Sequence, residues 1–385
     1  MTTAGGKAKD VTATTQGSEG HVAPRTVSLL QDPINKGGTA TVVKAYEAWA
    51  ALHRPEYRPY YLDDTHAGGI LRLRRWTPSD TPVPRVLPRA HVPMYRAARY
   101  KMRGIWSDIE EVHVIGAHVI HGSLAPDQAP SLVWLATLID DERLSALEFQ
   151  TRPRRLLYRA TLGPLSRIEA SVLSNASRVL AMSPYTADLI VERGFAPAAR
   201  VEVRTVPIDT DALCPPADNV ERSGLLFVGR AHDPRKGFPR IRALLDASRP
   251  ARAAGVDVVS AVSPGVTEGV RWLGKVESLV DVYQKAAMLV LPSLQEGLGI
   301  VAFEALACGT PVIAYRCGGP DRMLLESAGG IVVEDATGFR SAVEELLSDP
   351  GARAEMGSAG RSFVVDNFSL QDFLADRSLF EVRVQ

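Results

Sequence analysis

The sequence predicts an α/β protein made of two doubly wound, parallel-sheet domains. The chain has 385 residues, which is too long for one ordinary core and suits two domains. Short β-rich runs alternate with helical segments in both halves, and a Pro- and Asp-rich stretch lies between the halves. Such alternation favours parallel sheets that helices cover on both faces. We therefore expect ligands to bind in a central cleft, between the carboxyl ends of the two sets of strands.

The first half begins with a stretch rich in Thr, Gly and Lys, residues 1–24, which we interpret as a disordered tail. The N-terminal domain is expected over 25–205. Its expected elements are strands at 26–30, 110–120, 131–139 and 178–183, a helix at 39–52 capped by Thr39, and a helix at 184–194. Pro184 suits the first turn of the last helix, and Gly194 suits its end.

The second half follows a linker that we place at 206–222, and its domain is expected over 223–365. Its expected elements are strands at 224–229, 256–262, 286–292 and 311–315, and helices at 277–286, 300–309 and 339–349. The sequence "DTD" at 209–211 resembles a metal-binding spelling, but it lies in the linker and we interpret it as a turn.

The composition excludes several classes of protein. There are 44 basic and 44 acidic residues, so the net charge predicts no polyelectrolyte partner, and no nucleic-acid-reading motif is present. The three cysteines (Cys214, Cys308 and Cys317) have neither zinc-ligand spacing nor a disulfide framework, which favours a reducing cytoplasm. No run of about 18 apolar residues occurs, and the N-terminus has no apolar core, so we expect neither a spanning helix nor a secretory signal.

The stretch "EGLGIVAFEALACGTPVIAY", residues 296–315, contains two carboxylates in an apolar setting. Gly297 and Gly299 break any helix before them, so Glu296 is expected in the loop and Glu304 in the helix that follows. Free amides and the helix dipole at such a start suit a phosphate. A carboxylate at Glu304 can accept from both hydroxyls of a ribose. The alternative is a solvated glutamate that the helix dipole favours.

Cations occur in "FVGRAHDPRKGF", residues 227–238. Arg230 comes directly after an expected strand, and Lys236 lies a few residues later. We expect both on the same sheet rim as Glu296, where an arginine and a lysine can neutralise a diphosphate. A solvated basic loop is the alternative, and spacing alone does not decide whether Arg235 or Lys236 faces the site.

These segments together resemble a known family. The similar segments are "FVGR" (227–230), "RKG" (235–237), "RWLGKV" (271–276) and the long run from 290 to 321. They resemble the C-terminal domain of retaining GT-B glycosyltransferases of family four, the glycosyl transferases group 1, whose Glu-x7-Glu pattern matches Glu296 and Glu304. The resemblance is strong over 223–325 and weaker in the N-terminal half. It implies the GT-B fold: two Rossmann-like domains facing a central cleft, with a C-terminal helix at 366–385 that returns to the N-domain.

The resemblance also implies the chemistry. The donor would be a nucleoside-diphosphate sugar, a UDP-sugar or a GDP-sugar, used without a metal or other cofactor, and the N-terminal domain would hold the acceptor. Arg230 and Lys236 would stabilise the leaving diphosphate, Glu304 would hold the ribose, and Glu296 and His118 would face the transferred sugar. The other donor-binding positions that it implies are Gly37, Gly38, Gly274, Val276, Gly299, Ile300 and Val301.

Some positions stay open. His113 and His121 compete with His118, and a histidine at a strand end is more often structural. The family's Pro-Asn-Gly at the linker is replaced by "VPIDT" at 206–210, and its late glutamate is replaced by Asp321. These departures affect the expected hinge and sugar contacts, not the diphosphate site.

The sequence thus predicts a cytoplasmic, retaining, metal-independent hexosyltransferase. A phosphorylase or sugar-nucleotide epimerase on the same fold remains an alternative, as does a non-catalytic sugar-nucleotide-binding subunit. A dinucleotide-dependent oxidoreductase is disfavoured, because neither first strand is followed by G-x-G-x-x-G.

The acceptor side is less specific. Residues 71–106 hold nine Arg or Lys against one Asp, and "RPRRLLYRA" at 152–160 is a second basic stretch. These stretches suit the anionic inner face of a membrane, a phosphate-bearing acceptor, or simply a solvated face. The acidic run 140–142 lines either the acceptor side or a solvated helix start. Whether the acceptor is a small molecule, a glycan or a lipid does not follow from the sequence, nor does the oligomeric state.

Overall fold

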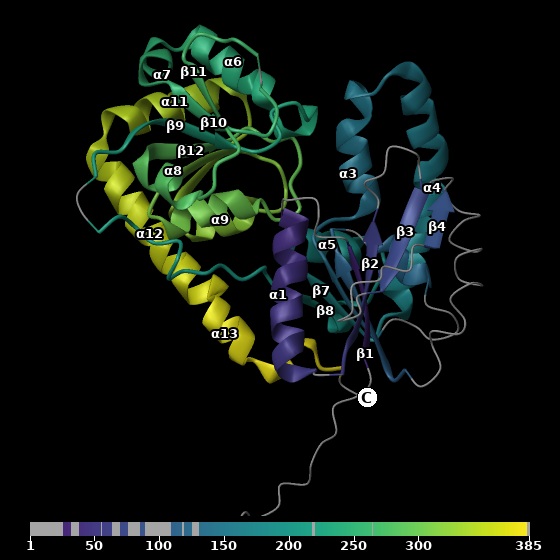
Figure 1. The fold of residues 1–385 in the computed structure, drawn as a ribbon. Helices are drawn as coiled ribbons and strands as arrows, with labels where there is room; N and C mark the ends of the chain where they lie inside the picture. The colour runs from purple at the N-terminus through teal and green to yellow at the C-terminus, as the bar shows by residue number, and fades with distance from the viewer. Residues whose placement is uncertain are drawn as a thin grey trace, which may run out of the picture.

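Two β-sheets, one in each half of the chain, organise the computed structural model (Figure 1). The structure describes residues 26–31, 38–54, 56–63, 70–75, 85–88, 109–117, 119–124, 131–217, 220–263 and 265–382. The predicted tail, Gly37, His118 and most of the basic stretch 71–106 lie outside these ranges. The α/β fold class with two doubly wound domains is confirmed.

The N-terminal sheet has eight strands in the order β4-β3-β2-β1-β5-β6-β7-β8. The strands are β1 (Thr26–Gln31), β2 (Arg58–Asp63), β3 (Ile70–Arg75), β4 (Arg85–Pro88), β5 (Glu111–Gly116), β6 (Leu132–Leu135), β7 (Arg178–Ala181) and β8 (Val201–Val203). In this order, every neighbouring pair from β2 onward to β8 is parallel. Strand β3 runs antiparallel to both β2 and β4. The antiparallel edge was not predicted. An antiparallel strand at the edge of an otherwise parallel sheet is common in doubly wound folds.

The C-terminal sheet has six strands in the order β11-β10-β9-β12-β13-β14, and every pair is parallel. The strands are β9 (Ser223–Val228), β10 (Val256–Val259), β11 (Val270–Gly274), β12 (Ala286–Leu291), β13 (Val312–Tyr315) and β14 (Gly330–Val333). The order reverses between β9 and β12, as in a Rossmann sheet. All six residues of β12 are buried, which is why this central strand reads as a continuous apolar run.

Helices cover both sheets. The α-helices are α1 (Gly38–His53), α3 (Ile139–Ala146), α4 (Arg152–Asn175), α5 (Pro184–Glu192), α6 (Phe238–Ala247), α7 (Arg249–Ala254), α8 (Val280–Lys285), α9 (Ile300–Ala307), α10 (Asp321–Glu326), α11 (Ala336–Ser348), α12 (Pro350–Phe368) and α13 (Leu370–Ala375). Short 3-10 turns are η2 (Ile120–Leu124), η3 (Leu147–Phe149), η4 (Ala198–Arg200), η5 (Pro234–Lys236) and η6 (Arg377–Phe380). Helix α1 starts one residue earlier than predicted, so Thr39 lies inside it and is not its cap. Helix α8 starts three residues later than predicted, after a turn at Ser278.

The chain crosses between the domains twice, side by side. The segment after β8 lies along the end of α12, where Ile208 N donates to Phe368 O at 2.7 Å and Leu370 N donates to Ile208 O at 3.1 Å. Beyond this point α13 runs down to α1 (Figure 1), and the indole of Trp49 donates to Asp376 O at 2.8 Å. The end of the chain therefore packs on the N-terminal domain although most of the preceding helix covers the C-terminal one.

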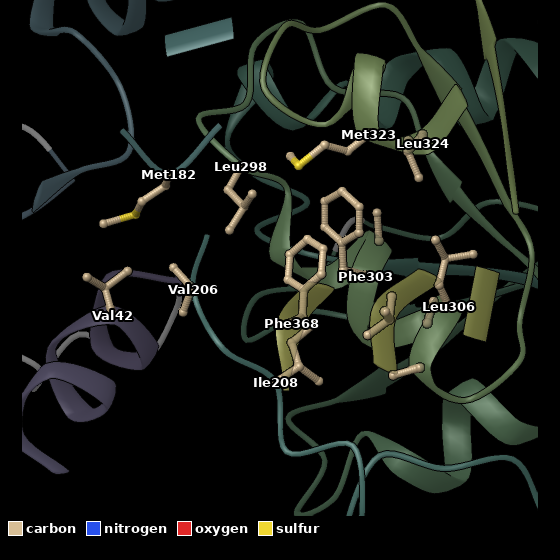
Figure 2. Close-up of a cluster of buried hydrophobic side chains, with 14 of the residues drawn as sticks. Val42, Met182, Val206, Ile208, Leu298, Phe303, Leu306, Met323, Leu324 and Phe368 are labelled. Atoms are coloured by element: carbon tan, nitrogen blue, oxygen red, sulfur yellow. The ribbon is translucent and has the colours of Figure 1, made fainter. Parts of the chain in front are cut away.

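A continuous apolar cluster joins the domains. Figure 2 shows Val42 and Met182 of the N-terminal domain on one side and Phe303 and Phe368 on the other, with Leu298 and the crossing segment between them. The rings of Phe303 and Phe368 stack with centroids 4.6 Å apart. Because these side chains belong to one core, the relative position of the two domains is set by apolar packing.

Among the described residues, no helix has the length and hydropathy that crossing a lipid bilayer requires.

Candidate functional site

The reversal of strand order places two loops side by side at the carboxyl edge of the C-terminal sheet. The loop after β9 carries Arg230 and η5, and the loop after β12 carries Ser293 and Glu296. In doubly wound sheets, ligands bind at the carboxyl ends of the strands beside such a reversal. The predicted residues Arg230, Lys236 and Glu296 thus meet on one rim.

Lys236 and Glu296 form the centre of this rim. The Lys236 Nζ donates to both carboxylate oxygens of Glu296, at 2.7 and 2.8 Å, and the Ser293 hydroxyl donates to Oε1 at 2.6 Å. The Glu296 side chain is 10% exposed and that of Lys236 is 25% exposed. An ammonium has three N–H donors, so Lys236 keeps one for a further acceptor.

The arginines beside it have different roles. Arg230 is 58% exposed and pairs with Asp233 at 2.9 Å, whereas Arg235 lies between Asp233 and Glu142 of the other domain, at 3.0 and 2.5 Å. Burial alone would raise the pKa of Asp233, but the hydrogen bonds and charges of Arg235, with the charge of Arg230, outweigh it and lower the pKa. The spacing ambiguity is resolved: Lys236 points to Glu296, and Arg235 points across to the N-terminal domain.

Glu304 lies in the second turn of α9 and is half-buried. Its Oε2 accepts the hydroxyl of Tyr283 at 2.8 Å, and Tyr283 is fully buried. Burial raises the pKa of Glu304, and the hydrogen bond from Tyr283 offsets part of that rise. Glu304 is therefore not a freely solvated glutamate, and Oε1 is the oxygen left to meet a ligand.

The N-termini of two helices meet beside these side chains. Gly299 has φ 69°, a left-handed conformation that favours glycine, and it starts α9 at Ile300. A Cβ added to Gly38, the first residue of α1, would lie 3.7 Å from Ile300 Cγ2. Since the first-turn amides of a helix point beyond its N-terminus, the amides of Ile300 and Val301 and those of α1 converge on one region that suits an anion.

Gly274 and Val276, which the sequence predicted to bind the donor, lie at the end of β11 and just after it. Gly274 has φ 72° and accepts from Ser260 N at 3.1 Å, and Val276 packs against the cluster that joins the domains. Both lie at the same carboxyl edge of the sheet as Arg230. A ligand bound at the β9–β12 reversal would reach them if it extended along the carboxyl edge of the sheet towards β11.

The three candidate histidines lie in different surroundings. His118 follows β5 but lies outside the described residues, as does Gly37. His113 is fully buried near the amino end of β5, where its Nδ1 and the hydroxyl of Tyr46 are 2.8 Å apart. Burial lowers the pKa of His113. This position, far from the carboxyl edge, favours a structural role for His113, and His121 is also buried.

The rim of the C-terminal sheet is connected to the N-terminal domain by residues to which the sequence analysis assigned no role. Gln295, next to Glu296, donates to Thr137 Oγ1 at 2.9 Å and to Asp141 Oδ2 at 3.0 Å, and Tyr185 donates to Asp141 at 3.2 Å. All three members of the acidic run 140–142 have partners and are not only solvated, since Asp140 pairs with Arg193 and Glu142 with Arg235. Ser293 and Gln295 lie within three residues of Glu296 in the sequence, whereas no sequence signal marked Tyr283, which is 21 residues from Glu304.

Two other acidic positions are structural. Asp321 accepts from the amides of Cys317 and Gly318, at 3.1 and 2.9 Å, and so closes the turn before α10. Asp209 Oδ1 accepts from the amides of Asp211 and Ala212, so the predicted turn at 209–211 is confirmed. Within the described ranges, no group of three His, Cys, Asp or Glu side chains is arranged to hold a metal ion.

Comparison with known families supports the resemblance. Residues 222–349 match the family described as "Glycosyl transferases group 1". A D-inositol 3-phosphate glycosyltransferase of Salinispora tropica is 28% identical over 247 residues, 54% of this chain and 51% of that protein. A GDP-mannose-dependent alpha-(1-6)-phosphatidylinositol monomannoside mannosyltransferase of Mycolicibacterium smegmatis is 32% identical over 239 residues, 53% of this chain and 62% of that protein. The chain thus spans about half the length of the first of these relatives and somewhat more of the second.

Solved structures extend the likeness to the whole fold. Sucrose-phosphate synthase from Thermosynechococcus elongatus superposes with a TM-score of 0.66 at 20% identity, over 91% of this chain and 96% of that one. HepE from Anabaena, in complex with UDP, gives 0.63 at 13% identity, over 91% and 97%. At these identities the likeness establishes the fold, and the predicted GT-B architecture is confirmed.

Proposed function

We propose that this chain, whose residues 222–349 belong to the glycosyl transferases group 1 and whose fold is GT-B, transfers a hexose from a nucleoside-diphosphate sugar to an acceptor. The observation that carries the proposal is the meeting of Lys236, Arg230 and the N-terminus of α9 at the β9–β12 reversal. Each supplies positive charge or N–H donors, and a departing diphosphate needs both.

The leaving group is stabilised in two ways. Lys236, held by Glu296, presents its third N–H donor, and Arg230 is exposed enough to turn from Asp233 towards a phosphate. The first-turn amides at Ile300 and Val301 supply fixed dipoles that need no reorganisation during the reaction. We propose that these groups replace a metal ion in neutralising the diphosphate.

The two glutamates hold the rest of the donor. Glu304 offers Oε1 to the ribose hydroxyls, because Tyr283 occupies Oε2. Glu296, which Lys236 and Ser293 fix in place, lies where the transferred sugar would follow the diphosphate. Retention would require the acceptor to attack from the face that the phosphate leaves, with a phosphate oxygen taking the acceptor's proton. Gly37 and His118 remain part of this proposal on the resemblance alone.

The relatives support the choice of donor and acceptor class. One is named for GDP-mannose and for an acceptor on phosphatidylinositol, and another is named for inositol 3-phosphate. We propose a UDP- or GDP-linked hexose as donor and a hydroxyl on a small molecule, glycan or lipid as acceptor.

The test is to measure calorimetric binding of UDP and GDP and turnover of their hexose derivatives. Lys236→Ala and Arg230→Ala should each lower turnover by about two to three orders of magnitude, as loss of one oxyanion-stabilising group does. Arg322→Ala is the matched control, because it removes an exposed arginine that pairs with Glu326 on the same helix.

Normal turnover in both cation variants would contradict the assigned roles. Release of sugar phosphate from donor and inorganic phosphate would instead favour a phosphorylase, and a changed sugar on the recovered nucleotide would favour an epimerase.

A further inference from the structure

Helices α3 and α4 form a projection that the donor site does not explain. We define the arm as residues 143–163, which include the end of α3, η3 and the first half of α4. Figure 1 shows the arm standing away from the N-terminal sheet as a pair of neighbouring helices. Among the residues of α4 whose burial is described, Leu165 is the first buried one, and those before it are exposed or half-buried.

The arm carries large apolar side chains that the described residues leave exposed to a large extent. Leu144 is 50% exposed, Phe149 is 42% exposed and Leu156 is 71% exposed. Three of the large hydrophobic side chains exposed in the described structure thus lie within thirteen residues of sequence. A single exposed leucine is ordinary, but such a group on one projection marks an interaction surface.

Polar contacts join the two helices of the arm. Arg143 donates to Thr161 Oγ1 at 2.9 Å, and its guanidinium lies 5.2 Å from the centroid of the Tyr158 ring. Arg155 donates to Leu147 O at 3.1 Å. These contacts join the helices while Leu144, Phe149 and Leu156 stay exposed.

The positive charge of the arm indicates that its partner is an anionic surface. Residues 143–163 contain five arginines (Arg143, Arg152, Arg154, Arg155 and Arg159) and one acidic residue, Glu148, although the whole chain has no net charge. Arg152 and Arg159 are exposed. Basic residues beside exposed leucine and phenylalanine fit an anionic lipid surface, where the cations meet headgroups and the apolar side chains enter the acyl boundary.

We propose that the arm docks this protein on an anionic lipid bilayer. The arm is also joined to the donor rim, because Glu142 at its base pairs with Arg235, the neighbour of Lys236. Docking would therefore hold the rim close to the membrane, where it could meet an acceptor carried by a lipid. This last step rests on the proposed function, whereas the docking itself does not.

The test is co-sedimentation of the full chain with vesicles of phosphatidylcholine alone or of phosphatidylcholine mixed with phosphatidylglycerol. We expect binding only to the anionic vesicles and weaker binding at high salt. The double variant Arg152→Gln and Arg159→Gln should weaken binding by about one to two powers of ten, because two surface cations are lost. Phe149→Ser with Leu156→Ser should weaken it by a similar factor.

The matched control is Arg249→Gln with Val266→Ser, which removes an exposed arginine and an exposed valine from the C-terminal domain and should leave binding unchanged. Circular dichroism and thermal unfolding, measured in the same variants, report that each still folds. Equal binding to neutral vesicles, or unchanged binding in both arm variants, would overturn the proposal. Since vesicle binding is read without sugar transfer, its failure and a failure of the proposed function are separate results.

Discussion

Glu304 is a half-buried carboxylate, and its proposed role is to bind the ribose of the donor. Tyr283 occupies one oxygen and orients the other, and burial raises the pKa of the carboxyl group. A ligand hydroxyl donates best to the ionised form. Below the raised pKa the protonated carboxyl group should hold the ribose less tightly, so donor affinity should fall as pH decreases through that value.

This dependence gives a residue-scale prediction. Calorimetric binding of UDP or GDP, measured from neutral to mildly acidic pH, should weaken in the parent protein more than in Glu304→Gln, which cannot titrate there. The glutamine variant is the control for phosphate protonation, which both proteins share. Tyr283→Phe removes a hydrogen bond that lowers the pKa of Glu304, so its loss of affinity should begin at a higher pH. Identical pH profiles in all three proteins would count against a titrating Glu304.

Gly237 forms the junction between η5 and α6. It ends η5, starts α6 and has φ 69°, and a Cβ there would lie 1.8 Å from Pro292 O. The loops after β9 and β12 approach so closely only because this residue has no side chain. That approach is what brings Lys236 to Glu296.

At the element scale we predict that Gly237→Ala is far more harmful than Gly194→Ala. Gly194 has nearly the same φ, 68°, but nothing lies within 4 Å of its Cβ position. Its substitution should therefore cost only the left-handed strain, about 1 kcal/mol. Gly237→Ala adds a clash with backbone, worth about 1–3 kcal/mol more. Thermal unfolding measures both; equal midpoints would mean that the β9–β12 approach is looser than described.

At the scale of the whole molecule, polar contacts add to the apolar cluster between the domains. Arg235 reaches Glu142, and Gln295 reaches Thr137 and Asp141. A Cβ on Gly297 would lie 2.6 Å from Ala136 O, so the two carboxyl edges are in close contact. The residues beside Lys236 and Glu296 thus also hold the domains together.

We expect Glu142→Gln to loosen the domains and to weaken donor binding by a few-fold, since a partly exposed ion pair contributes at most about 1 kcal/mol. Small-angle scattering should report a larger radius of gyration, and donor titration should report the affinity. Glu326→Gln is the control, because it breaks the Arg322 pair within one domain. Unchanged scattering and affinity in Glu142→Gln would assign domain placement to the apolar cluster alone.

The sequence by itself determined the two α/β domains, the central apolar strands and the glycine-led start of α9, because periodicity and turn residues act over a few neighbouring positions. It also identified Arg230, Lys236, Glu296 and Glu304 as a set through their resemblance to a family.

Only the tertiary structure decided which of Arg235 and Lys236 meets Glu296, that Tyr283 and Ser293 orient the glutamates, and that Gln295 reaches the other domain. Each of these contacts depends on strand order at the β9–β12 reversal or on how two domains pack. Partners such as Tyr283 and Glu304 are 21 residues apart, and Gln295 and Asp141 are 154 apart, distances over which no local pattern carries information.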